Sequence, residues 1–179
     1  MIQTNRLHLR PLTTDDAALM TEAVAESLPQ LLPWMGWAHP AYDQDDSEAW
    51  MGYAREMWSL GREFQFGVFA GSTYLGGCGI DQVDWRLRSA NLGYWIRTSE
   101  VGHGYAAEAG RAVVEWAFRM HTLFRIEIVV MAGNEGSERT AVRIGAQREG
   151  VARNRLTLRG SPRDATVYSL IPSGSPPEP

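Results

Sequence analysis

The segment at residues 89–120 constrains the fold more than any other, because an apolar strand there runs through a glycine-bracketed turn into a helix. Residues 91–96 form an aromatic, apolar run of strand length. Beyond Tyr105, apolar residues recur every three or four positions, which predicts a helix with one buried face. Gly102 and Gly104 let the turn approach a ligand closely. Free backbone N–H groups at a helix N-terminus attract anions, so the segment predicts a pyrophosphate site.

A dinucleotide-binding fold is the main alternative for this turn. Gly102, Gly104 and Ala107 also match the G-x-G-x-x-A pattern of that fold. Glu127 follows at about the separation expected of an acid that binds ribose. However, that fold alternates strands and helices, whereas residues 63–96 read as three consecutive strands with no helix between them. The order of elements therefore excludes it.

The apolar patterns along the whole chain predict a strand, two helices, three strands, a helix, a strand, a helix and two strands. The expected strands lie at residues 6–11, 64–70, 75–83, 91–96, 125–131, 146–154 and 165–171. The expected helices run from a cap at Thr13 or Thr14 to about Ser27, from a cap at Asp46 or Ser47 to about Leu60, and over 105–120 and 134–144. Residues 31–42 read as an aromatic loop. Only the crossover at 91–131 requires parallel neighbours, so we expect an α+β fold with a mixed, mainly antiparallel sheet.

The composition predicts one ordinary globular domain. Of the 179 residues, 44% are hydrophobic and 21% charged. We expect this domain at residues 1–171 and a flexible tail, rich in Pro, Ser and Gly, at 172–179. No membrane-length apolar run or signal-peptide layout is present, which favours a cytoplasmic protein without membrane contact. An isoelectric point near 5.6 argues against nucleic acid as a partner. The single Cys78 excludes a cysteine metal cluster and reads as a core residue, and we expect no metal.

Charge is distributed unevenly between the two parts of the chain. Residues 1–70 hold ten acids and four bases, whereas residues 71–179 hold eleven acids and thirteen bases. This asymmetry suits an anionic cofactor held by the second part and a cationic substrate attracted by the first. Simple solvation of the surface explains it equally well.

Five motifs in this order resemble the GCN5-related N-acetyltransferase (GNAT) family, specifically its RimJ/RimL-like branch. They are RLHLRPLTTDDA, PWMGWA, LGYWI, VGHGYAAEA and NEGSERTAVRIGA, and the similarity spans residues 4–170. The resemblance implies the GNAT fold and transfer of acetyl from acetyl-CoA to a primary amine by direct attack in a ternary complex. The acceptor in this branch is a protein N-terminus or a related amine. Two-subunit assembly is also possible in this branch.

The resemblance also implies which residues bind coenzyme A. Residues 101–106 match the loop whose amides hold the pyrophosphate, although Val101 replaces the usual Arg or Gln. Residues 94–96 match the strand that pairs with pantetheine and directs an amide, here assigned to Trp95, at the thioester oxygen. Asn134 matches a pantetheine contact and Ser137 the donor of a proton to the departing thiolate, although helix capping explains both. The expected cofactor-binding set is Tyr94, Trp95, Ile96, Val101, Gly102, His103, Gly104, Tyr105, Ala106, Asn134 and Ser137.

Asn91 departs from the family pattern, because many relatives carry the glutamate that is the usual candidate base at this position. An asparagine takes no proton from an ammonium group. Several explanations remain: a water relay, another carboxylate such as Asp81 or Glu26, an amine that binds neutral, or His39. Asn91, Trp95 and Ser137 are the expected residues of the reaction centre.

The acceptor is expected beside the aromatic loop, with Trp34, Trp37 and His39 as its contacts. Acidic residues that follow could attract a cation; they are Asp43, Asp45, Asp46 and Glu48. The alternative is that the aromatic residues belong to the core and the acids cap a helix. Two other functions remain open. One is a small-molecule acetyltransferase of the aminoglycoside or polyamine type, and the other is a catalytically weak acyl-CoA-binding protein, suggested by Val101 and Asn91.

Overall fold

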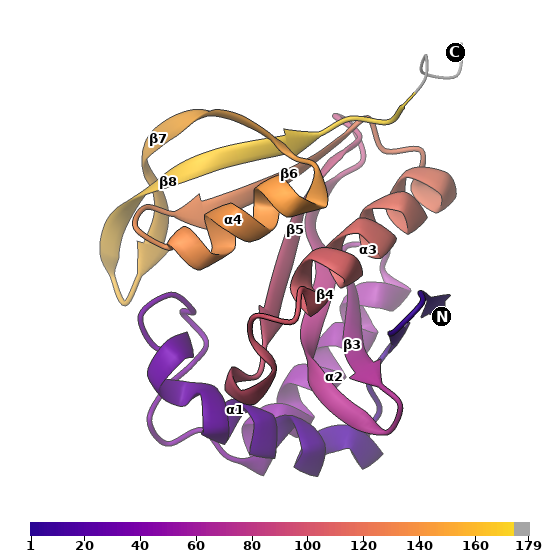
Figure 1. The fold of residues 1–179 in the computed structure, drawn as a ribbon, viewed down its shortest axis with the longest axis vertical. Helices are drawn as coiled ribbons and strands as arrows, with labels where there is room; N and C mark the ends of the chain where they lie inside the picture. The colour runs from indigo at the N-terminus through magenta and orange to yellow at the C-terminus, as the bar shows by residue number, and fades with distance from the viewer. Residues whose placement is uncertain (174–179) are drawn as a thin grey trace.

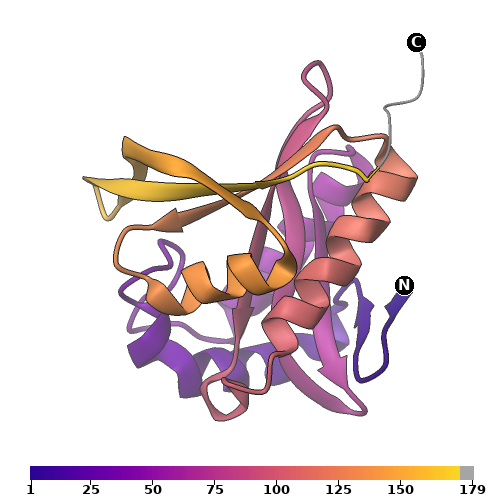
Figure 2. The ribbon, with the colours of Figure 1, turned by 45° about the horizontal axis from the view of Figure 1, so that its top comes forward.

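The computed structural model describes residues 1–173, so residues 174–179 of the expected tail lie outside the described part. Its centre is one eight-stranded sheet in the order β1-β2-β3-β4-β5-β6-β8-β7, with helices on both faces (Figures 1 and 2). The strands are β1 (Ile2–Gln3), β2 (His8–Arg10), β3 (Phe64–Ala70), β4 (Thr73–Asp84), β5 (Ser89–Ile96), β6 (Arg125–Met131), β7 (Gln147–Leu158) and β8 (Ser161–Leu170). The helices are α1 (Ala17–Leu31), α2 (Gln44–Ser59), α3 (Tyr105–His121) and α4 (Glu135–Ile144), with short 3-10 turns at Thr14–Asp16 and Thr98–Glu100.

The expected strands and helices are all present in the expected order, and the main differences are one added strand and several boundaries. The two-residue strand β1 was not expected. Helix α1 continues past Ser27 to Leu31. Helix α2 starts earlier than expected because Asp43 is its N-cap: the Asp43 carboxylate accepts hydrogen bonds from the N–H groups of Asp45 and Asp46. Strands β7 and β8 are longer than expected and form one continuous hairpin.

Apolar side chains cover both faces of the sheet. On one face, Val113 of α3 lies in the same buried cluster as Phe66 of β3 and Ile80 of β4. On the other face, Val24 of α1 packs in a cluster with Tyr74 of β4. These two clusters hold β3, β4 and β5 between helices, which fixes the strands that carry most of the expected site. Within the described chain, no helix is both long and apolar enough to cross a membrane.

A close contact between α3 and α4 sets the position of α4. A Cβ atom at Gly110 would lie 2.5 Å from the Cδ1 atom of Ile144. Gly110 therefore lets the side chain of Ile144 rest close to the backbone of α3, and a larger residue there would require Ile144 to shift. The start of α4, with Asn134 and Ser137, lies beside β5, where Ser137 contacts the Tyr94 hydroxyl.

Strands β5 and β6 form the one parallel pair in the sheet, and they stay together only briefly. Ser89, Ala90 and Asn91 pair with Arg125, Ile126 and Glu127, and the register ends there. Further along, residues 92–96 still pair with β4 while residues 128–131 pair with β8. The two strands visibly diverge in Figure 1. The sheet therefore contains a split whose edges are the free sides of β5 and β6.

Candidate active site

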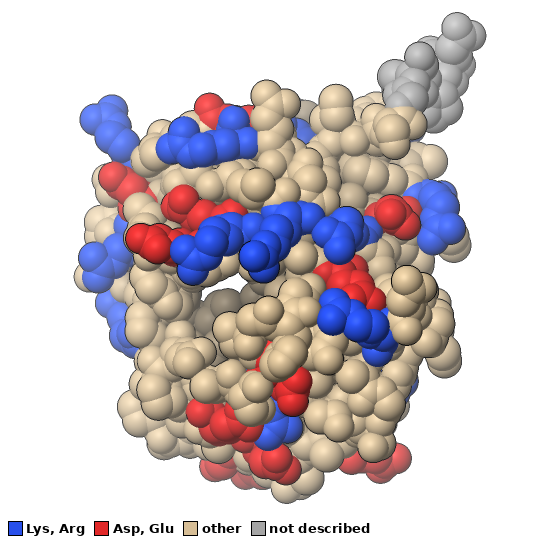
Figure 3. All heavy atoms as spheres, viewed as in Figure 1, with Lys and Arg blue, Asp and Glu red and all other residues tan. Residues whose placement is uncertain are grey.

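The split opens into a cavity of about 630 Å³. Its walls come from the aromatic loop after α1, from β5 and β6, from the start of α4 and from β7. Figure 3 shows a deep hollow on this side of the molecule, below basic side chains that gather over α4. The cavity brings together seven of the expected residues: Trp34, Trp37, Asn91, Tyr94, Trp95, Asn134 and Ser137.

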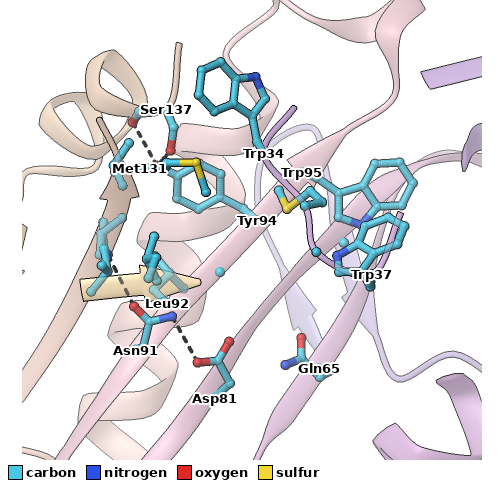
Figure 4. Close-up of a pocket in the computed structure, with 18 of the residues that line it drawn as sticks. Trp34, Trp37, Gln65, Asp81, Asn91, Leu92, Tyr94, Trp95, Met131 and Ser137 are labelled. Carbon is cyan, nitrogen blue, oxygen red and sulfur yellow. Dashed lines mark hydrogen bonds between the residues drawn. The ribbon is translucent and has the colours of Figure 1, made fainter. Parts of the chain in front are cut away.

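Two hydroxyl groups meet at the α4 end of the cavity. The Tyr94 hydroxyl donates to the main-chain oxygen of Ser137 at 3.0 Å and lies 3.1 Å from the Ser137 Oγ atom (Figure 4). The N–H group of Ser137 in turn donates to the Asn134 side chain at 3.1 Å, so Asn134 is the N-cap of α4. Burial raises the pKa of Tyr94 to about 12, so this phenol stays protonated at neutral pH. The sequence indicated a main-chain role for Tyr94 and missed its hydroxyl.

The glycine turn lies outside this cavity, at the N-terminus of α3. Gly102 and Gly104 have φ angles of 93° and 79°, a left-handed backbone that favours glycine. A Cβ atom added at Gly102 would meet nothing within 4 Å, so the space in front of the turn is open. The turn and the first N–H groups of α3 thus form a cradle that fits a pyrophosphate. Val101, Gly102, His103, Gly104, Tyr105, Ala106 and the strand residue Ile96 are not among the residues that line the cavity.

Arg6 supports the glycine turn, a feature that sequence reasoning missed. Its Nη1 atom donates to the main-chain oxygen of His103 at 3.0 Å, and its Nε atom donates to Glu108 of α3 at 2.7 Å. The guanidinium also lies over the ring of Tyr105, 4.7 Å from its centroid. One arginine from the β1–β2 connection therefore holds both sides of the turn.

Aromatic rings form the other end of the cavity. The ring of Trp37 lies 5.9 Å from that of Trp95 and 6.0 Å from that of Tyr42 (Figure 4). Trp34 lines the same cavity, whereas His39 does not. The His39 ring instead places its Nε2 atom 3.2 Å from Asp46, at the edge of the aromatic loop. Tyr42 also belongs to the core cluster beneath α1, so the aromatic loop contributes to the core and to the cavity together.

The charged side chains that line the cavity, among the described residues, are all acidic: Asp46, Glu63 and Asp81. Asp46 also accepts a hydrogen bond from the N–H group of Asp43 in the cap of α2. Asp43, Asp45 and Glu48 are not among the lining residues. The acids that line the cavity therefore overlap the expected set only at Asp46.

Asp81 and Asn91 face each other across β4 and β5, with the Asn91 Nδ2 atom donating to the Asp81 Oδ1 atom at 3.0 Å (Figure 4). Burial raises the pKa of Asp81 to about 6. Glu26, another candidate base, instead pairs with Arg97 and accepts from the N–H group of Ser99. These bonds, that of Arg97 first, lower the pKa of Glu26 to about 2. Glu26 does not line the cavity.

The tip of the β7–β8 hairpin covers part of the cavity, and we call it the roof. Residues 156–158 of β7 line the cavity, and Arg159 at the tip of the β7–β8 hairpin reaches the aromatic loop. The Arg159 Nη2 atom donates to the main-chain oxygen of Leu32 at 2.8 Å and to that of Ala38 at 3.4 Å. The hairpin thus spans the split.

The comparison with known proteins explains this architecture. The family model for the acetyltransferase (GNAT) domain matches residues 6–147. The chain belongs to the GNAT family. It is 28% identical to the N-acetyltransferase YdaF of Bacillus subtilis over 164 residues, 91% of this chain and 90% of that protein. It is 27% identical to the [ribosomal protein uS5]-alanine N-acetyltransferase of Escherichia coli, over 94% of this chain and 89% of that one. The structure of Mycobacterium smegmatis RimJ in complex with a CoA disulfide superposes with a TM-score of 0.82 at 26% identity, covering 92% and 81% of the two chains.

This GNAT protein is therefore an N-acetyltransferase of the RimJ/RimL-like type, which uses acetyl-CoA to acetylate a primary amine. Within the described residues, no group of three or more His, Cys, Asp and Glu side chains could hold a metal ion.

Proposed function

We propose that this GNAT protein acetylates the N-terminal α-amine of a protein, with acetyl-CoA and acceptor bound together in the split. The observation that carries the proposal is the roofed, acid-lined cavity between β5 and β6. Its acidic lining residues, Asp46, Glu63 and Asp81, suit an α-amine that arrives as a cation. The relative from Escherichia coli, named for the alanine of a ribosomal protein, supports the same class of acceptor.

The cofactor-binding residues follow from the free edges around the split. The N–H groups of residues 102–106 hold the pyrophosphate, and Arg6 fixes the turn in the absence of a side-chain donor at Val101. His103 stacks on Tyr105 at the same turn and borders the phosphates. The main chain of residues 94–96, which has no strand partner on the β6 side, binds pantetheine, and Asn134 borders it from α4. The backbone N–H of Trp95 polarises the carbonyl to be attacked.

The paired hydroxyls of Tyr94 and Ser137 return a proton to the departing sulfur. Bound acetyl-CoA supplies an activated acyl group as a thioester. The Ser137 Oγ atom lies at the cavity wall. The Tyr94 hydroxyl, 3.1 Å away, replaces the Ser137 proton when its own O–H turns from the main-chain oxygen of Ser137 to the Oγ atom. Trp34 and Trp37 contact the acceptor at the other end, and His39 borders its entrance through Asp46. The acidic lining favours an acceptor that arrives as a cation.

A thiol-release assay tests this function. The assay compares a short peptide with a free N-terminal alanine or serine, the same peptide with a blocked N-terminus and an internal lysine, and a panel of polyamines and aminoglycosides. We expect turnover with the free N-terminus and none with the blocked peptide. Preference for the small amines would replace the proposed acceptor. Binding of acetyl-CoA with no thiol release for any amine would support a binding protein instead.

The proposed acceptor also bears on location and assembly. A cytoplasmic location belongs to this proposal, and it is supported by the relative from Escherichia coli that is named for a ribosomal protein. The resemblance to the RimJ/RimL-like branch supports a pair of subunits, which sedimentation equilibrium measures directly: a mass of two chains supports the pair and a mass of one chain contradicts it.

A further inference from the structure

We propose that Asp81 takes the proton from the acceptor amine, and that Asn91 is a positioning residue that aims Asp81 at it. The base thus lies on β4 and not on β5, where the family resemblance placed it. This inference rests on the proposed function, since it requires an amine in the cavity.

The two oxygen atoms of Asp81 have different surroundings. The Oδ1 atom accepts from Asn91 at 3.0 Å and from Gln82 at 3.3 Å. The Oδ2 atom accepts no hydrogen bond from the described residues and lies over Gly93, where an added Cβ atom would be 3.4 Å away. Both Asp81 and Gly93 line the cavity. One oxygen is thus anchored and the other faces the space in which an amine would bind.

Asn91 is held in the orientation that this arrangement needs. Its Oδ1 atom accepts from the N–H group of Val129 at 3.3 Å, where β5 and β6 begin to separate. The amide oxygen is therefore occupied, and the amide Nδ2 atom points to Asp81. A glutamate at position 91 would place a second carboxylate beside Asp81 and would leave the Val129 N–H group without its amide acceptor. The presence of Asn91 is consistent with a base on the neighbouring strand.

The surroundings of Asp81 leave it able to accept a proton near neutral pH. Burial raises its pKa to about 6, the hydrogen bond from Asn91 lowers it, and the nearby charge of Glu63 on β3 raises it again. The other polar groups close to it are Gln82 of β4, the amide of Asn91 and the Tyr53 hydroxyl of α2, which donates to Glu63, and all three are uncharged at neutral pH. Within the described chain, Asp81 forms no ion pair with an arginine that would hold it ionised in acid. A base of this kind is about half ionised at pH 6 and mostly ionised at pH 7.

The proton balance of the step is complete. The Asp81 Oδ2 atom takes one proton from the ammonium group, and the freed nitrogen lone pair attacks the acyl carbon. The C–N bond forms and the C–S bond breaks. The Ser137 and Tyr94 hydroxyls supply a proton to the sulfur, and the second proton lost by nitrogen replaces it. Asp81 then releases its proton to solvent, which completes the cycle.

The decisive experiment is the pH profile of kcat/KM for the wild type, Asp81→Asn, Asp81→Glu and the control Asp84→Asn, which changes an acid on the same strand outside the cavity. In the wild type, we expect kcat/KM to rise with pH, with a midpoint near pH 6. In Asp81→Asn this rise should vanish and the rate at pH 7 should fall by about 100-fold. Asp81→Glu should restore part of the rate and of the pH-dependent rise. Asp84→Asn should match the wild type in both.

Retention of the rise in Asp81→Asn, or a loss below threefold, would overturn the proposal. If the wild type itself acetylates no amine, the proposed function fails. An active wild type with an equally active Asp81→Asn variant refutes the base alone. Acetyl-CoA affinity, measured by calorimetry on each variant, shows whether the cofactor site is intact.

The positioning role of Asn91 has its own readout. Asn91→Ala removes the hydrogen bond that lowers the pKa of Asp81, so the midpoint of the rise should move to higher pH. A purely structural role would lower activity at every pH and leave the midpoint unchanged, and this result would remove Asn91 from the proposal.

Discussion

Strand β5 has two unequal neighbours. On its β4 side, residues 91–96 pair without interruption, whereas on its β6 side only residues 89–91 have partners. The paired side holds Asp81 against Asn91 and fixes one oxygen of the carboxylate. The open side leaves backbone groups free for a ligand and admits the hydroxyls of Tyr94 and Ser137. The site thus combines a paired side of β5 with an unpaired one. In the proposed reaction, the paired side carries the base Asp81 and the unpaired side carries the proton donors Tyr94 and Ser137.

The largest expected effect comes from a substitution in the glycine turn, which precedes α3. Gly104→Val places a branched side chain at a φ angle of 79°, at the N-cap of α3. Loss of two charge-assisted hydrogen bonds to pyrophosphate, about 3 kcal/mol together, should weaken acetyl-CoA about 100-fold. Calorimetric titration measures this.

Gly71→Val is the matched control, because Gly71 also has a left-handed backbone but lies in the β3–β4 turn. Equal acetyl-CoA affinity for Gly104→Val and the wild type would show that the turn does not hold the cofactor. Equal weakening by Gly71→Val would point to strain instead.

The next effect separates the two hydroxyls on the open side. Ser137→Ala and Tyr94→Phe should each lower kcat by about tenfold with little change in acetyl-CoA affinity, because their proton is needed only as sulfur departs. The double variant should lose little more than either single variant, since the hydroxyls act as one donor. Steady-state kinetics with a fixed peptide measures all three. Multiplied losses would show that the two hydroxyls act independently, and losses in acetyl-CoA affinity alone would show that they bind the cofactor and do not donate the proton.

The paired side should show a smaller effect, on stability. The pKa of Asp81 rises from an ordinary value of 3.8 to about 6 on folding. Between these values the folded protein binds a proton that the unfolded chain has lost, so the free energy of unfolding falls as pH increases from about 4 to 6. Asp81→Asn removes this penalty and should be more stable than the wild type by about 1–2 kcal/mol at pH 7.

Urea unfolding at pH 4 and pH 7 checks this prediction. The advantage of Asp81→Asn should disappear at the lower pH, where the wild-type carboxyl is protonated in the folded state. An inactive variant that is also less stable at pH 7 would indicate that Asp81 supports the fold and not the reaction.

The smallest effect concerns the roof over the open side. Arg159→Ala removes hydrogen bonds worth about 0.5–1 kcal/mol, so KM for the acceptor should rise about threefold while kcat stays the same. Arg153→Ala, on the exposed part of the same hairpin, is the control. An unchanged KM in Arg159→Ala would mean that the hairpin does not guide the acceptor.

The order of elements was predictable because each strand and helix has its own apolar pattern. The boundaries that were wrong have local causes. Strand β1 has two residues, too few for a pattern, and three closely spaced acids at 43, 45 and 46 offer several possible caps for α2. Strand β7 is mostly exposed and rich in arginine, so it lacks the alternation that marks a half-buried strand.

Site residues could be predicted from the sequence where they lie together on one segment. Contacts between residues of two distant segments could not. Ser137 and Asn134 share one helix start, so their motif is visible in the sequence. The relation between Asp81 and Asn91 depends on the register of β4 against β5, and the Arg6 contact joins residues about a hundred positions apart. Glu26 looked as suitable as Asp81 until Arg97 was seen to hold it. Tertiary pairing, which a single sequence does not display, decides between such candidates.

The Arg6 contact ties the start of the chain to a turn that handles the cofactor. Thr4 and Arg6 both bond to Glu108, and Arg6 also holds the main chain of His103. Proteolytic trimming of the first six residues would therefore loosen the turn without touching any residue of the cavity. If such trimming weakens acetyl-CoA binding, residues 1–6 influence KM for the cofactor without touching it. A protease that removes them would then inhibit the enzyme.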